Sequence, residues 1–132
     1  MTKPLKILIT GVAGFLGSHL AEKLSNMKHK VVGIDNMIGG YKDNVPKNIE
    51  FHEIDCCDLK AVKNVMKGVN VVYHCAATAH EGLSVFSPYE ITKNNYLASV
   101  SVFTAAISNK VKRIIFCSSM ARYGDQQTPF TE

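Results

Sequence analysis

The chain has 132 residues, of which 46% are hydrophobic and 20% charged, with 9 Gly and 4 Pro. This composition excludes disordered, collagen-like and coiled-coil classes, and the length suits one hydrophobic core. The formal net charge of +4 comes from scattered basic residues, so we expect no nucleic-acid partner. No stretch approaches the roughly 20 apolar residues that span a bilayer, so we expect no membrane association.

Short apolar runs alternate with longer helix-like segments along the whole chain. The runs at residues 5–10, 31–35, 49–55, 70–76 and 113–118 predict strands. Because they are rich in β-branched and aromatic residues and nearly continuous, they are typical of a parallel sheet covered on both faces.

Three helices are predicted between these strands. The first buries an apolar stripe of Leu16, Leu20, Leu24 and Met27 on the sheet. The second begins after Asp58 as N-cap, carries Leu59, Val62 and Val65 or Met66 on one face, and stops at Gly68. The third runs from about 89 to 109 with Leu97, Val100, Thr104 and Ile107 on one face, and Val102, Phe103 and Ala106 allow a second buried face. This order predicts a doubly wound α/β fold whose ligands bind at the carboxyl ends of the strands.

A glycine-rich turn joins the first strand to the first helix, with Gly11, Gly14 and Gly17 spaced three and three. Gly11 permits the tight turn, Gly14 lets backbone amides approach a pyrophosphate, and Gly17 lets the helix pack closely on the strand. Glycines in loops are more often plain turns, so the neighbouring motifs must support this interpretation.

Two carboxylates lie at the ends of later strands. Asp35 lies where a carboxylate accepts hydrogen bonds from the adenosine ribose and repels a 2′-phosphate, which favours NAD over NADP. Asp55 is placed to bind the adenine amino group. The alternatives are a strand-to-loop turn at Asp35 and Asn36 and a simple cap at Asp55 or Asp58.

The four cysteines are Cys56, Cys57, Cys75 and Cys117. They form no Cys-x-x-Cys pair and have no His at zinc-finger spacing, so we expect neither a metal site nor a disulfide framework. We therefore interpret all four as free thiols in a reducing cytoplasm. This includes Cys75 and Cys117, although they fall at neighbouring strand ends.

Together these motifs resemble the extended short-chain dehydrogenase/reductase family of nucleotide-sugar epimerases and dehydratases. The resemblance rests on Thr10-Gly11-Val12-Ala13-Gly14-Phe15-Leu16-Gly17, Asp35-Asn36, Asp55, His74-Cys75-Ala76-Ala77, Pro88 with Asn95, and Ser118-Ser119 followed by Tyr123-Gly124. It implies a Rossmann-type NAD-binding domain over residues 1–132, truncated before the substrate region of a longer enzyme. It also departs from the family at Ala98 and Ser99, where Gly and Thr are usual, and at Arg122, where Val is usual.

The resemblance assigns roles to individual residues. The implied cofactor-binding set is Gly11, Ala13, Gly14, Phe15, Leu16, Gly17, Asp35, Asn36, Gly40, Asp55, Cys56, Cys75, Ala76, Ala77, Asn95 and Ser118. Ser119 matches the active-site Ser that hydrogen-bonds the reacting sugar hydroxyl, although a lone Ser at a strand end more often caps a turn. His80 is expected near the substrate.

The family's general base is a Tyr in a Tyr-x-x-x-Lys string. The string Tyr89–Lys93 occurs 30 residues before Ser119, whereas the family places it after, so we interpret it as a surface pair. We therefore expect the chain alone to be inactive.

The resulting hypothesis is an NAD-dependent epimerase or dehydratase acting on a UDP-sugar by transient hydride transfer, forming a homodimer. The loop from Asp35 to Tyr41 is most similar to UDP-glucose 4-epimerase-like members. The loop does not distinguish these members from decarboxylases or 4,6-dehydratases, which are also alternatives. The alternatives are a non-catalytic NAD-binding module and a hydroxysteroid-dehydrogenase-like reductase of the same family.

Overall fold

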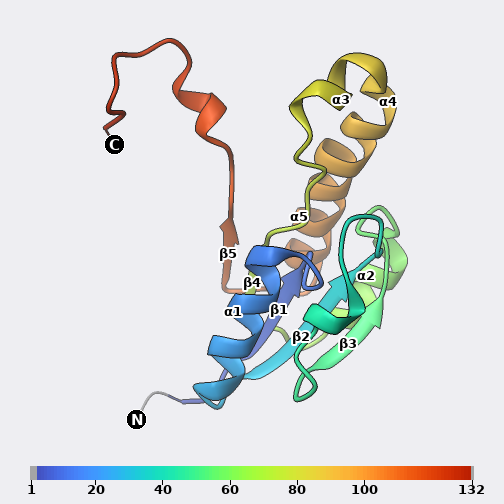
Figure 1. The fold of residues 1–132 in the computed structure, drawn as a ribbon. Coiled ribbons are helices and arrows are strands. Elements are labelled where there is room, and N and C mark those ends of the chain that lie inside the picture. Colours follow the sequence, from blue (N-terminus) through green and yellow to red (C-terminus); the bar gives the residue numbers. More distant parts are fainter. Residues whose placement is uncertain (1–2, 132) are drawn as a thin grey trace.

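Five parallel strands form one sheet in the order β3-β2-β1-β4-β5 (Figure 1). The structure is a computed structural model that describes residues 3–131. The strands are β1 (Lys6–Thr10), β2 (Lys30–Asp35), β3 (Glu50–Glu53), β4 (Val71–His74) and β5 (Arg113–Phe116). All five predicted strands are confirmed, each within two residues of its predicted bounds. The doubly wound parallel sheet is confirmed with them.

Helices cover both faces of this sheet (Figure 1). They are α1 (Phe15–Asn26), α2 (Leu59–Val65), α3 (Glu81–Phe86), α4 (Pro88–Ile91) and α5 (Ala98–Ser108), with short 3-10 turns η1 (Lys42–Asn44) and η3 (Met120–Tyr123). A π-helical segment, η2 (Thr92–Leu97), joins α4 to α5, so the third predicted helix is one rod with a widened turn inside it. Between β2 and β3 the chain forms the turn η1 in place of a crossover helix.

Two apolar clusters fill the layers. Ile7, Ile9 and Val31 point to the α1 side and pack with Ala21. Leu8, Val32, Ile34 and Val72 point to the other side and pack with residues of α2 and α5. The alternation along β1 sends successive side chains to opposite faces, as expected of a strand buried on both sides.

The predicted buried face of α1 is partly wrong. Gly17 and Ala21 are buried, Leu20 and Leu24 are partly buried, and Leu16 is 49% exposed. Met27, the last residue of the predicted stripe, is also exposed. Small residues face the sheet because they let the helix axis approach it closely.

The face predicted for the third helix is wrong in the same sense. The buried stripe of α5 is Ala98, Ser101, Val102, Ala105 and Ala106. Leu97 and Val100 are exposed, and Ile107 is 78% exposed. Of the two faces considered, the second one, with Val102 and Ala106, is the face that packs on the sheet and on α2.

Caps and turns set the ends of α2. The Asp58 carboxylate accepts a hydrogen bond from the Ala61 amide at 3.0 Å, which confirms the predicted N-cap. Gly68 has a φ of +72°, a left-handed conformation that suits glycine at the end of the helix. At the far end, Asn109 Nδ2 donates to the Lys63 carbonyl at 3.1 Å and joins α5 to α2.

Candidate functional site

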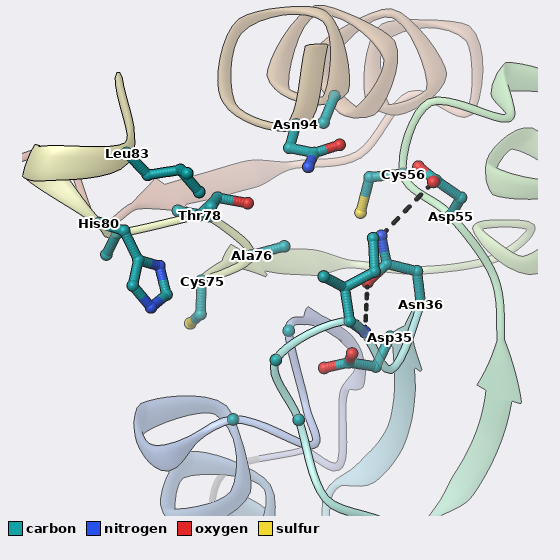
Figure 2. Close-up of a pocket in the computed structure, with 18 residues that line it drawn as sticks. Asp35, Asn36, Asp55, Cys56, Cys75, Ala76, Thr78, His80, Leu83 and Asn94 are labelled. Carbon is teal, nitrogen blue, oxygen red and sulfur yellow. Dashed lines mark hydrogen bonds between the residues drawn. The ribbon is translucent and has the colours of Figure 1, made fainter. Parts of the chain in front are cut away.

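A pocket of about 350 Å³ lies at the carboxyl ends of the central strands (Figure 2). Predicted cofactor residues that line it are Gly11, Gly14, Asp35, Asn36, Gly40, Asp55, Cys56, Cys75, Ala76 and Ala77. They come from four strand ends that are far apart in the sequence and adjacent in the sheet. The pocket therefore occupies the position at which doubly wound sheets bind their ligands.

The glycine-rich turn forms one wall. The Gly11 amide donates to the Ile34 carbonyl at 2.9 Å, and Gly11 has a φ of +70°. A Cβ atom at Gly11 would lie 2.8 Å from the backbone of Ala76, and one at Gly17 would overlap the carbonyl oxygen of Gly11. Both glycines are thus required because another part of the backbone comes close to them. This is the role predicted for Gly17, and at Gly11 it adds to the predicted tight turn.

The N-terminus of α1 opens toward this wall. Gly14 is the N-cap; within residues 3–131 no side chain caps it, and its first turn carries no acidic residue. The first amides of a helix have no intrahelical partner and carry a partial positive charge. Gly14 lines the pocket, so this uncapped end suits an anionic group such as a pyrophosphate.

The Asp35 carboxylate stands at the end of β2, 8% exposed. Its Oδ2 accepts from the Ala13 amide at 3.0 Å, and its Oδ1 accepts from the Met37 amide at 2.8 Å. An ionised carboxylate has about four lone-pair sites, so two remain for hydroxyl donors. Asp35 thus holds the glycine-rich turn against the following loop and still faces the pocket.

The loop after β2 folds over Ala13. The Tyr41 amide donates to the Ala13 carbonyl at 3.1 Å, and Asn44 Nδ2 donates to the same oxygen at 3.0 Å. This docking brings Ile38, Gly39 and Gly40 to the pocket.

Asp55 and Asn36 meet on the neighbouring side (Figure 2). Asn36 Nδ2 donates to Asp55 Oδ2 at 3.4 Å, and the Cys57 amide donates to Asp55 Oδ1 at 2.7 Å. Partial burial would raise the pKa of Asp55, but the hydrogen bonds from Cys57 and Asn36 and the charge of Lys93 outweigh it and lower that pKa. Asp55 is consequently held as a carboxylate beside Cys56.

A chain of hydrogen bonds supports the pocket floor from below. The Ala76 amide donates to Thr10 Oγ1 at 3.1 Å. Ser99 donates its hydrogen to the Asn95 carbonyl at 2.6 Å, so it accepts from His74 Nε2 at 2.9 Å. Since Nε2 of the neutral ring carries the hydrogen, His74 Nδ1 accepts from the Thr10 hydroxyl at 2.7 Å. Burial lowers the pKa of His74 to about 4, so the ring is neutral.

Asn95 fixes the loop after β4. Its Oδ1 accepts from the Thr78 amide at 2.7 Å, and its Nδ2 donates to the Thr78 carbonyl at 3.2 Å. Thr78 lines the pocket, whereas Asn95 lies behind it. The side chain that sequence reasoning assigned to the cofactor therefore positions the pocket wall.

The remaining predicted residues lie outside the pocket lining. These are Ala13, Phe15, Leu16, Gly17, Asn95, Ser118 and Ser119. Ala13 and Gly17 lie in the wall behind Gly11 and Gly14, and the exposed side chains of Phe15 and Leu16 leave only their amides near it.

Ser118 and Ser119 belong to the segment after β5, which runs away from the sheet (Figure 1). Ser119 Oγ accepts from the Ala121 amide at 3.2 Å as the N-cap of η3. This is the turn-cap geometry that is common for a lone Ser at a strand end. The structure does not bring Ser119 together with the pocket residues.

Sequence reasoning missed several residues of the lining. Ile38, Leu83 and Asn94 line the pocket. His80 lines it too, and its expected place near the substrate stays a prediction. Ile38 lies beside Met37 in the loop after β2, and Asn94 directly precedes Asn95. Leu83 gave no signal, because it lies on α3, a short helix whose position depends on its packing against α4.

The Tyr89–Lys93 string lies on the surface as predicted. Tyr89 is 76% exposed on α4, and Lys93 Nζ is 3.9 Å from a Glu90 carboxylate oxygen. Neither residue lines the pocket.

Within residues 3–131, no helix combines the length and apolar character that a membrane span requires. Over the same residues, no group of three or more His, Cys, Asp or Glu side chains could hold a metal ion.

The strand order, the glycine-rich turn and the pocket at the strand ends define a Rossmann-type α/β protein. The chain belongs to the NAD dependent epimerase/dehydratase family, whose model matches residues 7–132. This confirms the resemblance inferred from the motifs, and NAD is the cofactor that the family's description names.

Individual relatives cover nearly the whole chain. It is 33% identical to the UDP-N-acetyl-alpha-D-glucosaminuronate decarboxylase of Bacillus cytotoxicus over 130 residues, 96% of this chain and 40% of that protein. The UDP-glucose 4-epimerase of Thermotoga maritima, solved with UDP-glucose, superposes with a TM-score of 0.90 at 32% identity, over 96% of this chain and 42% of that one. The UDP-glucose 4-epimerase of Brucella ovis, solved with NAD, gives 0.91 at 32% identity, over 97% and 40%. The chain thus spans about two fifths of the length of these relatives.

Proposed function

We propose that the pocket binds NAD. The observation that carries this proposal is the pairing of an uncapped helix N-terminus with a buried carboxylate across one pocket. The first amides of α1, which follow Gly14, suit an anionic group, and Asp35 suits a group with hydroxyl donors. The two ends of a dinucleotide's adenosine diphosphate half have this chemistry. When bound, NAD supplies a hydride acceptor that can return the hydride to the same substrate.

The predicted cofactor residues fall into groups by their place around the pocket. The amides of Phe15, Leu16 and Gly17 at the start of α1 would donate to the pyrophosphate, whereas the amides of Gly11, Ala13 and Gly14 donate within the protein and hold the shape of the turn. Asp35 would accept from the adenosine ribose with Asn36 and Gly40 beside it, and Asp55 and Cys56 would lie at the adenine. The backbone of Cys75, Ala76 and Ala77 passes beneath the pyrophosphate and the nicotinamide ribose, with Asn95 behind that wall and Ser118 after β5. The relative from Brucella ovis, solved with NAD, supports NAD as the cofactor.

Charge at Asp35 makes the site selective for NAD. A 2′-phosphate would approach a buried carboxylate whose two oxygens already accept from backbone amides. The carboxylate can accept from a ribose hydroxyl, but it has no proton to offer a phosphate oxygen.

For the reaction, we propose 4-epimerisation of a UDP-sugar by transient hydride transfer to NAD, with residues 1–132 as the NAD-binding unit of a longer enzyme. Two relatives named UDP-glucose 4-epimerase support it, one of them solved with UDP-glucose. The chain is about as identical in sequence to a decarboxylase as to these epimerases, so the reaction needs a direct test. Ser119 is the proposed partner of the sugar hydroxyl. On its own, the chain should bind NAD without turnover, because its Tyr89–Lys93 string lies outside the pocket.

One observation favours a second candidate, a non-catalytic NAD-binding module. Ser119 caps η3 and lies outside the pocket lining, where a module without chemistry would tolerate it. The two candidates differ in turnover and agree in NAD binding.

Association and location complete the proposal. Exposed apolar side chains along α4, η2 and α5, namely Tyr89, Tyr96, Leu97, Val100 and Ile107, support a homodimer. The four free cysteines support a cytoplasmic location.

Calorimetric titration of the chain with NAD and with NADP tests the binding proposal. We expect NAD to bind at least about tenfold more tightly than NADP, and Asp35→Asn to narrow that ratio, since one repulsive charge is removed. Circular dichroism checks that the variant is folded. A folded wild-type chain that binds neither nucleotide contradicts the proposal.

The reaction is tested with UDP-glucose and UDP-galactose, using this chain and any longer product of the same reading frame. Chromatography separates the two sugars. Interconversion by the longer product supports the epimerase, and NAD binding without interconversion supports the non-catalytic module.

A further inference from the structure

Two thiols meet at the carboxyl ends of β4 and β5. The last paired residues of these parallel strands are His74 and Phe116. Cys75 and Cys117 come directly after them, so the two cysteines lie side by side at the ends of neighbouring strands. The Cys117 thiol donates to Cys75 Sγ with the sulfur atoms 3.6 Å apart. A disulfide has its sulfur atoms about 2.05 Å apart, so bond formation requires the sulfurs to approach by about 1.5 Å.

The backbone around Cys117 can supply that movement. The Cys117 amide is bonded to the His74 carbonyl only at 3.4 Å, where the ladder between the two strands ends. Ser118, which follows, has a φ of +53°, a left-handed conformation in which a non-glycine residue is strained. A shift at Cys117 therefore disturbs few contacts of the sheet.

The two thiols differ in access. Cys117 is exposed, whereas Cys75 is half-buried and lines the pocket (Figure 2). Burial is the main cause that raises the pKa of Cys75 to about 12, and the adjacent Cys117 thiol is the second. A reagent from solvent thus reaches Cys117 first, and Cys75 is positioned as the second thiol.

The other two cysteines are placed differently. Cys56 is buried in the core, and burial raises its pKa to about 12. Cys57 donates to the Lys93 carbonyl at a sulfur-to-oxygen distance of 3.4 Å. These residues serve as internal controls for thiol reactivity.

We propose that Cys75 and Cys117 form a dithiol site that small-molecule disulfides such as oxidised glutathione convert to an internal disulfide. This proposal goes beyond the expectation from sequence that both thiols stay reduced, and it does not depend on NAD binding or on any turnover.

The exchange proceeds in two balanced steps. The Cys117 thiolate attacks one sulfur of oxidised glutathione, a bond forms between Cys117 and glutathione, and one glutathione leaves as the thiolate. The Cys75 thiolate then attacks the Cys117 sulfur and expels the second glutathione. The protein loses two electrons and two protons, and oxidised glutathione is reduced to two molecules of glutathione.

The consequence for the fold is local. Because Cys75 lines the pocket, the bridge ties the segment after β5 to the pocket wall. Transient disulfides of this kind are the form in which cytosolic proteins use cysteine oxidation.

The test treats the whole chain with oxidised glutathione at mildly alkaline pH, blocks free thiols, and measures intact mass and the linked peptides. We expect a chain that lacks two hydrogens, retains no glutathione and yields a Cys75–Cys117 peptide pair. Cys75→Ser should stop with glutathione on Cys117, Cys117→Ser should keep its Cys75 thiol, and the matched control Cys57→Ser should form the bridge at the wild-type rate.

The pH dependence is a second readout. The second step should accelerate about tenfold per pH unit below the pKa of Cys75, because the thiolate is the attacking form. Glutathione that persists on wild-type Cys117, a bridge involving Cys56 or Cys57, or a bridge between two chains would each overturn the proposal. If Cys75→Ser does not fold, the wild-type mapping and Cys117→Ser still decide between these results.

Discussion

The hydroxyl of Thr10 and the imidazole of His74 are hydrogen-bonded across the adjacent ends of β1 and β4, with Oγ1 and Nδ1 2.7 Å apart and both side chains buried. Since Thr10 also accepts from Ala76, this pair connects the sheet to the pocket floor. A neutral ring is required, because a protonated Nδ1 could not accept from Thr10.

The stability of the protein should therefore fall in mild acid. The pKa of His74 is lowered by burial to about 4 in the folded chain, whereas an unfolded His titrates near 6.5. Between these values the unfolded state binds more protons, so stability present above pH 6.5 is lost as the pH falls toward 4, in total roughly 3 kcal/mol. Urea unfolding across this pH range measures the loss.

His74→Asn should flatten that pH dependence, because the side chain no longer titrates, at the cost of lower stability at pH 7. His19→Asn, at an exposed position on α1, should keep the wild-type slope. An unchanged slope in His74→Asn would assign the acid sensitivity to carboxylates such as Asp55. His74→Gln replaces the Asn variant if the latter does not fold.

Two glycine-to-alanine changes in helices should have opposite effects. At Gly17 the added methyl group overlaps the backbone of Gly11, so Gly17→Ala should destabilise the chain by more than about 2 kcal/mol. At Gly82 in α3 nothing lies within 4 Å of an added Cβ, so Gly82→Ala should gain up to about 1 kcal/mol from helix propensity. Thermal unfolding followed by circular dichroism compares them, and equal destabilisation would contradict the close packing at Gly17.

Removing the cap of α2 should cost about 1 kcal/mol. Asp58→Ala leaves the Ala61 amide without its side-chain acceptor, whereas Asp58→Asn keeps an oxygen in place. Chemical denaturation of both variants gives the difference. Identical midpoints for the two would mean that the cap hydrogen bond does not contribute to stability.

Asn95 should govern the order of the loop after β4. Asn95→Asp keeps the acceptor for the Thr78 amide but loses the donor to the Thr78 carbonyl and sets two oxygens against each other. Hydrogen exchange at residues 76–80 should accelerate by about tenfold or more, equivalent to about 1.4 kcal/mol. Asn94→Asp, at the neighbouring position in the pocket lining, should leave this exchange within about twofold of wild type, and equal acceleration in both would refute the role given to Asn95.

The strands and the glycine-rich turn were predictable from the sequence because their signals are local. In a run such as Val31 to Asp35, the apolar residues predict a buried strand and the aspartate predicts where it ends. Gly11 likewise predicts a turn without reference to distant parts of the chain. The cap at Asp58 is local in the same way.

The buried faces of the long helices were not predictable from apolar periodicity. In α1 and α5 the helix axis lies so close to the sheet that Gly17, Ala21, Ala98 and Ala105 fit inside, and larger side chains such as Ile107 turn outward. The π-helical turn at η2 also rotates α5 relative to α4, which a pattern of constant period cannot register.

The pocket was predictable where a motif supplied the residue and not where packing did. Asp35 ends β2 and Ala76 lies two residues beyond β4, whereas Leu83 reaches the pocket from α3, which packs against α4. Asn95 shows the limit of motif transfer, since the residue matches the family pattern and its amide binds the loop backbone.

The order of the strands leaves the sheet with two unlike borders. Within residues 3–131, β3 and β5 each pair on one side only. Along β3, Glu50 is joined to His52 and to Lys30, and Glu53 follows, so charge opposes the addition of a foreign strand. Along β5, Ile114, Ile115 and Phe116 present an apolar strand whose outer backbone groups are open to pairing. A further strand would therefore pair with this sheet more readily at the β5 edge than at the β3 edge.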